Sequence, residues 1–140
     1  DRQNNTQVAF YQNYVLALDR IQAWDEAMEV LARINFDVLD PRNLSRFLFL
    51  RGNILANQEK LNEAEPDLRR AIEIDANNFD ARLSYGKLLF VSGNLLQARE
   101  AFTDLLELDP QHYSADEARI LIETIDGYLA QQPGLQAPLQ

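Results

Sequence analysis

A pattern of about 34 residues occurs twice in direct succession between residues 45 and 112 of this chain. Gly52 and Gly86 lie 34 residues apart, and Ala64 and Ala98 have the same separation. Self-similarity at a fixed spacing of roughly 20–50 residues is typical of solenoid proteins, in which each repeat stacks only on its neighbours. The repeat therefore constrains the fold more than any other feature of the sequence.

A third copy with weaker similarity precedes these two. The segment 24–27 (Trp-Asp-Glu-Ala) matches 61–64 (Leu-Asn-Glu-Ala), but Ala27 lies 37 residues before Ala64 instead of 34. About three residues are therefore inserted, and we expect them to lengthen the second helix of the first repeat or its exit. The three predicted repeats span about residues 8–41, 45–78 and 79–112.

Each repeat is predicted to contain two antiparallel helices. Apolar residues at the i, i+3, i+4 and i+7 spacing share one helix face, and the segment 98–108 has them at Ala98, Ala101, Phe102, Leu105 and Leu108. Gly86 is small at a point where two helices have to approach closely, since a bulky side chain there would overpack the contact. The pattern indicates a helix–turn–helix unit.

Residues typical of helix ends and turns lie between the predicted helices. Asp40-Pro41 and Asp109-Pro110 each combine a capping residue with a proline that can begin the next helix. Gly93-Asn94 and Asn77-Asn78 predict turns with further capping residues.

Pro66 disagrees with this pattern. It comes four residues after Asn62, and if Asn62 caps the helix, the proline removes a backbone hydrogen bond and crowds the preceding turn. We therefore expect a late start or a mild kink in this helix.

Residues 114–131 predict a seventh helix. Its apolar residues share one face, at Ala118, Leu121, Ile122, Ile125 and Leu129. This helix fits the terminal element with a polar outer side that a stacked array needs, or else it is the first helix of a further repeat. The predicted fold is all-α, an α-solenoid of about three repeats and a capping helix, in one domain over residues 1–131. Residues 132–140 predict a flexible tail.

These repeats resemble the tetratricopeptide repeat family. The spacing of 34 residues and a pattern of Gly, Ala, Phe and Pro are typical of that family. The third copy has all four residues, at Gly86, Ala98, Phe102 and Pro110. The second has Ala76 in place of the proline, and the first is the most divergent. The resemblance covers about residues 8–112 and implies a module that binds protein or peptide.

The charge balance argues against general nucleic-acid binding. The chain has a net charge of −9, from 13 basic and 22 acidic residues, and no run of Lys or Arg. Nucleic-acid binding depends on clustered positive charge that replaces counterions. No apolar segment approaches the roughly 20 residues of a membrane span, so membrane insertion is not expected. Cytoplasm and periplasm are both compatible with the sequence.

Residues for catalysis or metal binding are scarce, so we expect no enzyme activity, no cofactor and no metal. Cysteine is absent and His112 is the single histidine, so neither a catalytic triad nor a zinc site can be assembled from such residues. We expect His112 to be an exposed loop residue. The segment 75–80 resembles a calcium loop only weakly, because it lacks the glycine and the distal glutamate of that loop.

The family resemblance implies that the first helices of the repeats line a concave groove. The corresponding positions are Gln12, Leu16 and Asp19 in the first repeat, Arg46, Phe49, Asn53 and Asn57 in the second, and Leu83, Lys87 and Phe90 in the third. The wider set adds Ala9, Arg20, Ala56, Asp80 and Val91. Residues 47–50 are four consecutive apolar residues, which one packed side of a helix cannot bury, so Phe49 is a candidate for an exposed groove aromatic, as is Phe90.

Two functions remain open on the sequence. The first is a non-catalytic scaffold that holds a peptide segment or partner helix in this groove. The second is a structural or oligomerisation element that stacks on itself or on neighbouring domains, with self-association through the apolar face of the terminal helix. Some family members clamp the C-terminal carboxylate of chaperone tails with Lys and Asn, but Gln12 and Leu16 occupy those positions here, so chaperone-tail binding is not predicted.

Overall fold

The computed structural model describes residues 2–132, with side chains from residue 4 onward, and the regular structure of this part is helical throughout. Seven α-helices and one short 3-10 helix follow one another: α1 (Arg2–Arg20), α2 (Trp24–Ala32), the 3-10 helix η1 (Phe36–Val38), α3 (Pro41–Asn57), α4 (Leu61–Ile74), α5 (Phe79–Val91), α6 (Leu95–Leu108) and α7 (Ala115–Ala130). The predicted all-α solenoid with seven helices is confirmed. None of the described helices is long and apolar enough to cross a membrane.

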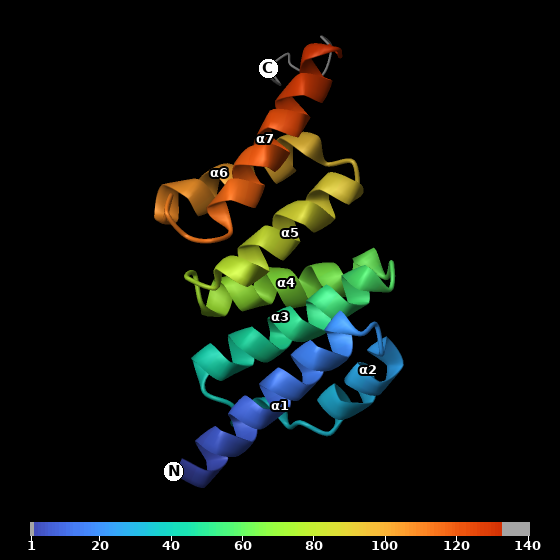
Figure 1. Ribbon diagram of the computed structural model, residues 1–140, viewed down its shortest axis with the longest axis vertical. Helices are drawn as coiled ribbons and strands as arrows, with labels where there is room; N and C mark the ends of the chain where they lie inside the picture. The colour runs from blue at the N-terminus through green and yellow to red at the C-terminus, as the bar shows by residue number, and fades with distance from the viewer. Residues whose placement is uncertain (1, 133–140) are drawn as a thin grey trace.

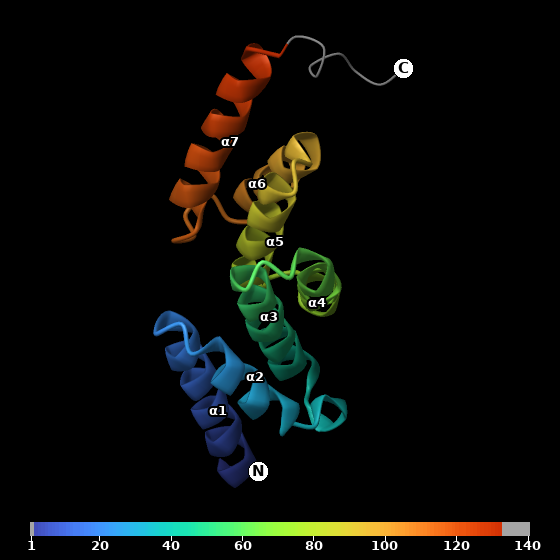
Figure 2. The ribbon, with the colours of Figure 1, turned by 90° about the vertical axis from the view of Figure 1, so that its right-hand side faces the viewer.

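The helices stack in chain order along one axis, with α1 and α7 at opposite ends (Figure 1). Seen from the side, α1 and α7 lie on the same side of the stack, and α4 lies on the other (Figure 2). The core is divided in the same way: one buried cluster joins α1, α2 and α3, and another joins α5, α6 and α7. Each of these clusters therefore joins the two helices of one repeat to the helix that follows, so that each repeat packs on its neighbour, as in other solenoids.

Small residues allow the paired helices to touch. A Cβ atom added to Gly86 would lie 2.4 Å from Cε1 of Phe102 on α6, and one added to Gly52 would lie 2.8 Å from Cγ of Leu68 on α4. Glycine is otherwise unfavourable inside a helix. Close helix packing, as predicted, explains why it recurs at this position.

Several predicted turns and caps are present. The Asp40 side chain accepts a hydrogen bond from the Asn43 amide, with Pro41 in the first turn of α3. The Asn78 side chain caps α5 by accepting from the Ala81 amide. Gly93 has a φ of +83° in the turn between α5 and α6, a conformation that favours glycine.

The prediction for Asp109-Pro110 was wrong. Asp109 is the C-cap of α6, and α7 begins only at Ala115. The Asp109 carboxylate instead accepts a hydrogen bond from the Gln111 amide, and the Asp109 carbonyl accepts one from His112. These bonds close a turn between the two helices, which separates the proline from the start of the next helix.

The expected late start of the helix around Pro66 was also wrong. α4 begins at Leu61 with Lys60 as its N-cap, and Pro66 lies inside the helix. A proline there cannot donate a hydrogen bond to the carbonyl of Asn62. Both residues are exposed, so water can satisfy that carbonyl, and the helix continues.

The inserted residues of the first repeat lie at its exit. α2 has only nine residues, and η1 follows it before α3 begins. The expectation of a longer second helix is therefore not met, whereas the alternative of a longer exit is.

The predicted apolar face of the terminal helix packs on the rest of the chain. Ala118, Ile125 and Leu129 are buried in the cluster that also contains Phe102 of α6. Of the stripe predicted on α6, Ala98, Phe102 and Leu105 are buried and Ala101 is half-buried, whereas Leu108 at the helix end is 48% exposed. The division into a domain over 1–131 and a tail over 132–140 stays a prediction, since residues 133–140 lie outside the described part.

Candidate binding site

A pocket of about 950 Å³ lies between α1, α3, the start of α5 and the turn from α6 to α7. This volume is at the upper end of what small-ligand sites have, roughly 300–1,000 Å³. We call it the central pocket. Its lining residues are Gln12, Asn13, Leu16, Arg20, Pro41, Arg42, Arg46, Phe49, Leu50, Ile74, Asp75, Asn77, Asn78, Phe79, Asp80, His112 and Tyr113.

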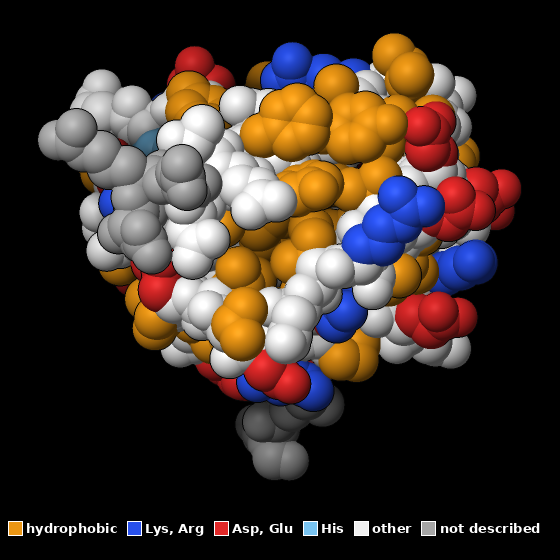
Figure 3. All heavy atoms as spheres, turned by 90° about the horizontal axis from the view of Figure 1, so that it is seen from below, with side chains coloured by type: hydrophobic (Ala, Val, Ile, Leu, Met, Phe, Trp, Pro, Cys, Tyr) orange, Lys and Arg blue, Asp and Glu red, His pale blue; other side chains and the backbone are white. Residues whose placement is uncertain are grey.

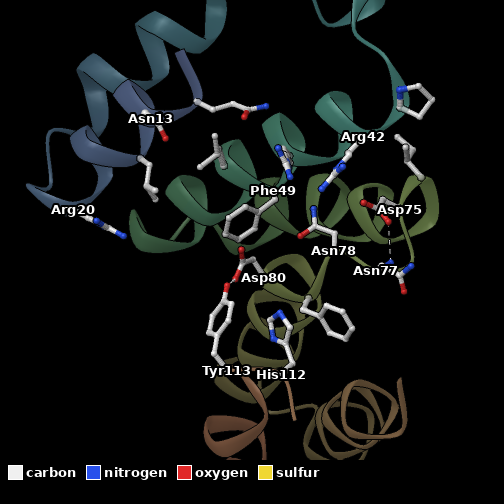
Figure 4. Close-up of a pocket in the computed structure, with 17 residues that line it drawn as sticks. Asn13, Arg20, Arg42, Phe49, Asp75, Asn77, Asn78, Asp80, His112 and Tyr113 are labelled. Carbon is white, nitrogen blue, oxygen red and sulfur yellow. Dashed lines mark hydrogen bonds between the residues drawn. The ribbon is translucent and has the colours of Figure 1, made fainter. Parts of the chain in front are cut away.

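Phe49 lies in the middle of the central pocket (Figure 4). Its neighbours Phe47, Leu48 and Leu50 are buried, whereas Phe49 is half-buried and packs against three of the core clusters. The helix therefore buries most of the apolar run 47–50 on two packed sides. The ring of Phe49 is left as apolar surface for a ligand.

Three arginines bring positive charge to the central pocket. Arg20 is at the end of α1, and Arg42 and Arg46 are in the first half of α3. All three are exposed, and no side-chain hydrogen bond or ion pair connects them to another group within residues 4–132. What distinguishes them from other arginines without an ion pair, such as Arg70, is that all three line one pocket.

The two acidic residues of the central pocket are engaged locally. Asp75 accepts a hydrogen bond from the Asn77 amide at 3.0 Å, and Asp80 accepts one from the Tyr113 hydroxyl. Neither carboxylate is paired with an arginine in the described structure. Figure 4 shows Arg20 and Arg42 on different sides of the pocket, with Asp80 and Tyr113 on another.

The turn between α6 and α7 forms one wall of the central pocket. The ring of His112 is stacked on that of Phe79 and tilted against that of Tyr113, with both centroid distances 4.2 Å. His112 is half-buried, not an exposed loop residue as predicted. Partial burial of the Tyr113 phenol and its hydrogen bond to Asp80 raise the pKa of Tyr113 to about 12.

Sequence reasoning did not identify this wall. The fold of the turn after Asp109 decides that His112 and Tyr113 lie against the first turn of α5, and no local pattern in the sequence specifies that contact. The Asp109-Pro110 pair indicates a turn but not its direction.

The groove residues predicted from the family resemblance divide into two sets in the structure. Gln12, Leu16, Arg46 and Phe49 line the central pocket. The remaining six lie outside it, at Asp19, Asn53, Asn57, Leu83, Lys87 and Phe90.

Asp19 and Asn53 form a hydrogen-bond ladder across the first helices of the repeats. Asp19 accepts from the Asn53 amide at 3.0 Å, from Asn57 at 2.9 Å and from the Trp24 indole at 3.1 Å. The Asn53 carbonyl oxygen in turn accepts from the Ser84 hydroxyl at 3.0 Å. The ladder connects α1, α3 and α5, so these polar side chains are already used within the chain.

The predicted residues of the third repeat lie beside the terminal helix. Leu83 and Phe90 are half-buried against the core cluster that contains residues of α6 and α7. Lys87 forms an ion pair with Glu117 of α7. These contacts place the C-terminal part of the predicted groove close to α7.

The described structure contains no cluster of side chains that could bind a metal ion. Within residues 4–132, no group of three or more His, Asp or Glu side chains is placed to hold a metal ion. The groups that line the central pocket are guanidinium groups that can bind anions, amides that can hydrogen-bond to peptide groups, and an aromatic ring that offers apolar surface.

Comparison with known proteins gives a family match. The family model of the tetratricopeptide repeat matches residues 55–120. Among curated proteins, the protein O-mannosyl-transferase TMTC3 of Homo sapiens and that of Mus musculus are 36% identical over 69 residues. That match spans 49% of this chain but only 8% of the length of those transferases.

Comparison with solved structures also identifies tetratricopeptide domains as similar in fold. The first tetratricopeptide domain of Spaghetti (RPAP3), bound to the HSP90 peptide SRMEEVD, superposes with a TM-score of 0.76 at 22% identity, over 89% of this chain and 97% of that one. The first such domain of human RPAP3 gives 0.75 at 21% identity, over 91% and 95%. The predicted resemblance to tetratricopeptide repeat proteins is confirmed.

Proposed function

Since this chain is built from tetratricopeptide repeats, we propose that it is a non-catalytic interaction module that holds an extended acidic peptide segment in the central pocket. Proteins with this fold are in general interaction modules, and a structural neighbour binds a peptide. The finer statement, that this pocket and these arginines bind an acidic segment, rests on the chemistry of the pocket.

The observation that carries the proposal is the set of unpaired guanidinium groups. Arg20, Arg42 and Arg46 line one pocket, whereas the other arginines without an ion pair in the described structure lie outside it, at Arg33, Arg70 and Arg82. An unpaired arginine can form a bidentate, charge-assisted hydrogen bond to a carboxylate. Three of them around one cavity favour a ligand with several carboxylates.

The rest of the pocket fits a peptide backbone between those carboxylates. Asn13 and Asn77 offer amide groups that can donate to and accept from a peptide, and the ring of Phe49 offers apolar area. The ladder through Asp19 and Asn53 fixes the spacing of α1 and α3, which reduces the ordering cost of binding.

The Spaghetti domain binds SRMEEVD, a segment with three acidic side chains as well as a terminal carboxylate. The Lys and Asn residues expected for a terminal-carboxylate clamp are replaced by Gln12 and Leu16 in this chain. We therefore propose that side-chain carboxylates, and not the chain terminus, are recognised here.

The proposed role is binding without catalysis. The central pocket has one histidine and two carboxylates, and both carboxylates are hydrogen-bonded to neighbouring groups. That leaves no arrangement of nucleophile, base and orienting group of the kind that nucleophilic catalysis requires.

Fluorescence anisotropy with two peptide pools tests the proposal. Both pools contain octapeptides with blocked ends, in which Glu alternates with mixed apolar residues in one pool and Gln replaces Glu in the other. We expect the Glu pool to bind at least ten times more tightly, and Arg46→Ala to weaken that binding several-fold at low salt, because a charge-assisted contact is lost.

Arg70→Ala is the matched control for Arg46→Ala. Arg70 is also exposed and unpaired in the described structure, but it lies outside the central pocket. Arg70→Ala changes the net charge by the same amount as Arg46→Ala and should leave binding of the Glu pool almost unchanged. Equal binding of the two pools, or equal loss in both variants, would show that the pocket does not recognise carboxylates.

Self-association through the terminal helix, the alternative from the sequence, is not favoured by the structure. The apolar face that motivated it packs within the chain, with Ile125 fully buried. The outward side of α7 has two separate large apolar residues, Ile120 and Tyr128, and isolated apolar side chains are ordinary on protein surfaces.

A further inference from the structure

Helix α1 has a second apolar stripe that faces away from the core. Phe10 is 61% exposed, Tyr14 36% and Ile21 72%, and Ala17 between them is also exposed. Phe10, Tyr14 and Ala17 share one side of α1. Ile21 lies in the turn directly after the helix, where its amide still donates to the Ala17 carbonyl at 3.2 Å, so it continues the same side. Figure 3 shows hydrophobic side chains gathered over this end of the molecule. We call these four residues the α1 stripe.

The equivalent positions of the stripe in the later repeats can be compared for burial. Phe10 and Ala17 correspond to Phe47 and Ile54 of α3, each 37 residues later. Phe47 and Ile54 are almost fully buried, in a cluster with residues of the preceding helix α2. The same side of α5 contributes Leu88, buried in a cluster with residues of α4. Phe10 and Ala17 therefore occupy helix-packing positions of the repeat, and no helix within residues 2–132 covers them.

Helix α1 also lacks the charges that would oppose contact with another protein. Residues 3–18 contain no Asp, Glu, Lys or Arg, although charged residues make up 25% of the chain. With a net charge of −9 on each molecule, two copies repel each other over most of their surfaces. The uncharged stretch 3–18 of α1 is therefore the place where close approach has the lowest electrostatic cost.

We propose that two copies of this chain associate through the α1 stripe, with the two helices antiparallel. A two-fold axis between Tyr14 and Ala17 places Phe10 of one copy opposite Ile21 of the other. The same axis places Tyr14 opposite Ala17, a large residue against a small one. A symmetric contact needs a self-complementary patch of this kind.

The aromatic part of the stripe is already ordered in the single chain. The rings of Phe10 and Tyr14 are stacked with centroids 6.0 Å apart, and the Tyr14 hydroxyl donates to Glu26 at 2.9 Å. Side chains that are held in place lose less conformational entropy when they enter an interface. Because one pair of helices buries less area than the roughly 1,200–2,000 Å² of standard stable interfaces, the dimer is weak.

Sedimentation equilibrium over concentrations from about 10 μM to 1 mM, a range suited to weak association, tests the proposal on the chain as it stands. We expect a reversible shift of the average mass from monomer towards dimer. Phe10→Lys and Ile21→Glu, examined separately, should each weaken association at least ten-fold. Both sites are exposed, so the variants should keep the wild-type circular dichroism spectrum.

Mixing the two variants tests the antiparallel register. In a mixed dimer the introduced lysine of one copy lies opposite the introduced glutamate of the other, and an unchanged Phe10–Ile21 contact remains on the far side of the axis. The mixture should therefore recover at least half of the association that each variant lost. Val91→Lys, at an exposed apolar site at the end of α5, should associate like the wild type.

Several results would overturn the proposal. A wild-type chain that stays monomeric at 1 mM contradicts it, and so do single variants that associate as well as the wild type. A mixture as weak as the separate variants excludes the antiparallel register. Loss of association in Val91→Lys would mean that the contact lies elsewhere. None of these outcomes depends on the central pocket, since peptide binding by the monomer is measured separately.

Discussion

Two glycines in helices of this chain have opposite surroundings. A Cβ atom at Gly86 would lie 2.4 Å from the ring of Phe102, which is fully buried, whereas one at Gly127 on α7 would have no neighbour within 4 Å. The helical conformation favours alanine over glycine at both sites by about 1 kcal/mol. Only at Gly86 does packing oppose that preference. The contact with Phe102 therefore requires glycine at position 86, whereas no contact requires it at Gly127.

Alanine substitutions at these two sites should therefore change stability in opposite directions. Gly86→Ala should destabilise the chain by about 1–3 kcal/mol, because the Phe102 ring has to move within a packed core. Gly127→Ala should stabilise it by about 0.5–1 kcal/mol. Urea unfolding of both variants measures the difference, and a Gly86→Ala variant as stable as Gly127→Ala would contradict the close helix contact.

The ion pair between Arg99 of α6 and Asp126 of α7 should give the stability a specific dependence on pH. The hydrogen bond from Arg99 lowers the pKa of Asp126 below its ordinary value of 3.8. A carboxyl with a depressed pKa stabilises the fold above its unfolded pKa, and this contribution is lost as the pH falls through the folded pKa. Asp126→Asn should therefore be slightly less stable than the wild type at pH 7, and this difference should shrink as the pH falls through the lowered pKa of Asp126.

Thermal unfolding at pH 7 and pH 3 measures this decrease. The effect should be small and salt-dependent, because both side chains are almost half exposed and exposed ion pairs contribute little. Asp104→Asn is the control, since Asp104 is an exposed acid on α6 without an ion pair in the described structure. A constant difference between Asp126→Asn and the wild type at both pH values would show that the pair has no electrostatic role.

At the scale of elements, the helices could be predicted from the sequence, but the connections were harder. The stripe that begins at Ala98 and the recurring glycines specify paired helices through local spacing alone. The turn after Asp109 and the continuous helix through Pro66 depend on which backbone groups find a partner, and that is decided by surrounding structure and solvent. Local capping rules therefore gave the wrong boundary at both places.

Ser45 connects three helices, so its loss should affect their packing. Its hydroxyl donates to the Ala71 carbonyl of α4 at 2.7 Å and accepts from the Asn78 amide, which caps α5, at 2.9 Å. Ser45 is fully buried, and removing one partner of a buried hydrogen bond costs about 1–3 kcal/mol. Ser45→Ala should lower the free energy of unfolding by that amount.

Ser92→Ala is the control for Ser45→Ala, because Ser92 is exposed in the turn after α5. Urea unfolding of the two variants gives the comparison. If Ser45→Ala is no less stable than Ser92→Ala, the hydrogen bonds that connect α3, α4 and α5 do not stabilise the stack.

At the scale of the whole molecule, the candidate site is only partly a property of the repeat. The family resemblance, applied to the repeat positions, predicted that Phe49 and Arg46 would lie in the site. It did not predict that Asp19 and Asn53 would bond to each other, or that His112 would close one wall. Those contacts join residues about 30 or more positions apart, and their geometry depends on how the repeats stack.

The stacking of the repeats also distributes the charges. Acidic residues outnumber basic ones across the chain, yet the three arginines without a partner at the central pocket come from α1 and α3. A ligand with carboxylates would form ion pairs with these three arginines. The stacking also leaves the α1 stripe exposed, where we propose that a second copy binds.

Nuclear magnetic resonance mapping of the bound peptide tests the central claim most directly. A ¹⁵N-labelled chain titrated with the blocked Glu peptide pool should show progressive shifts in the side-chain Nε–H signals of Arg42 and Arg46 and in the backbone amides around Phe49 and Asn78. The Gln pool should shift them much less at the same concentration. Shifts confined to the outer surfaces of α4 and α6, or none with either pool, would contradict the assignment of the central pocket as the binding site.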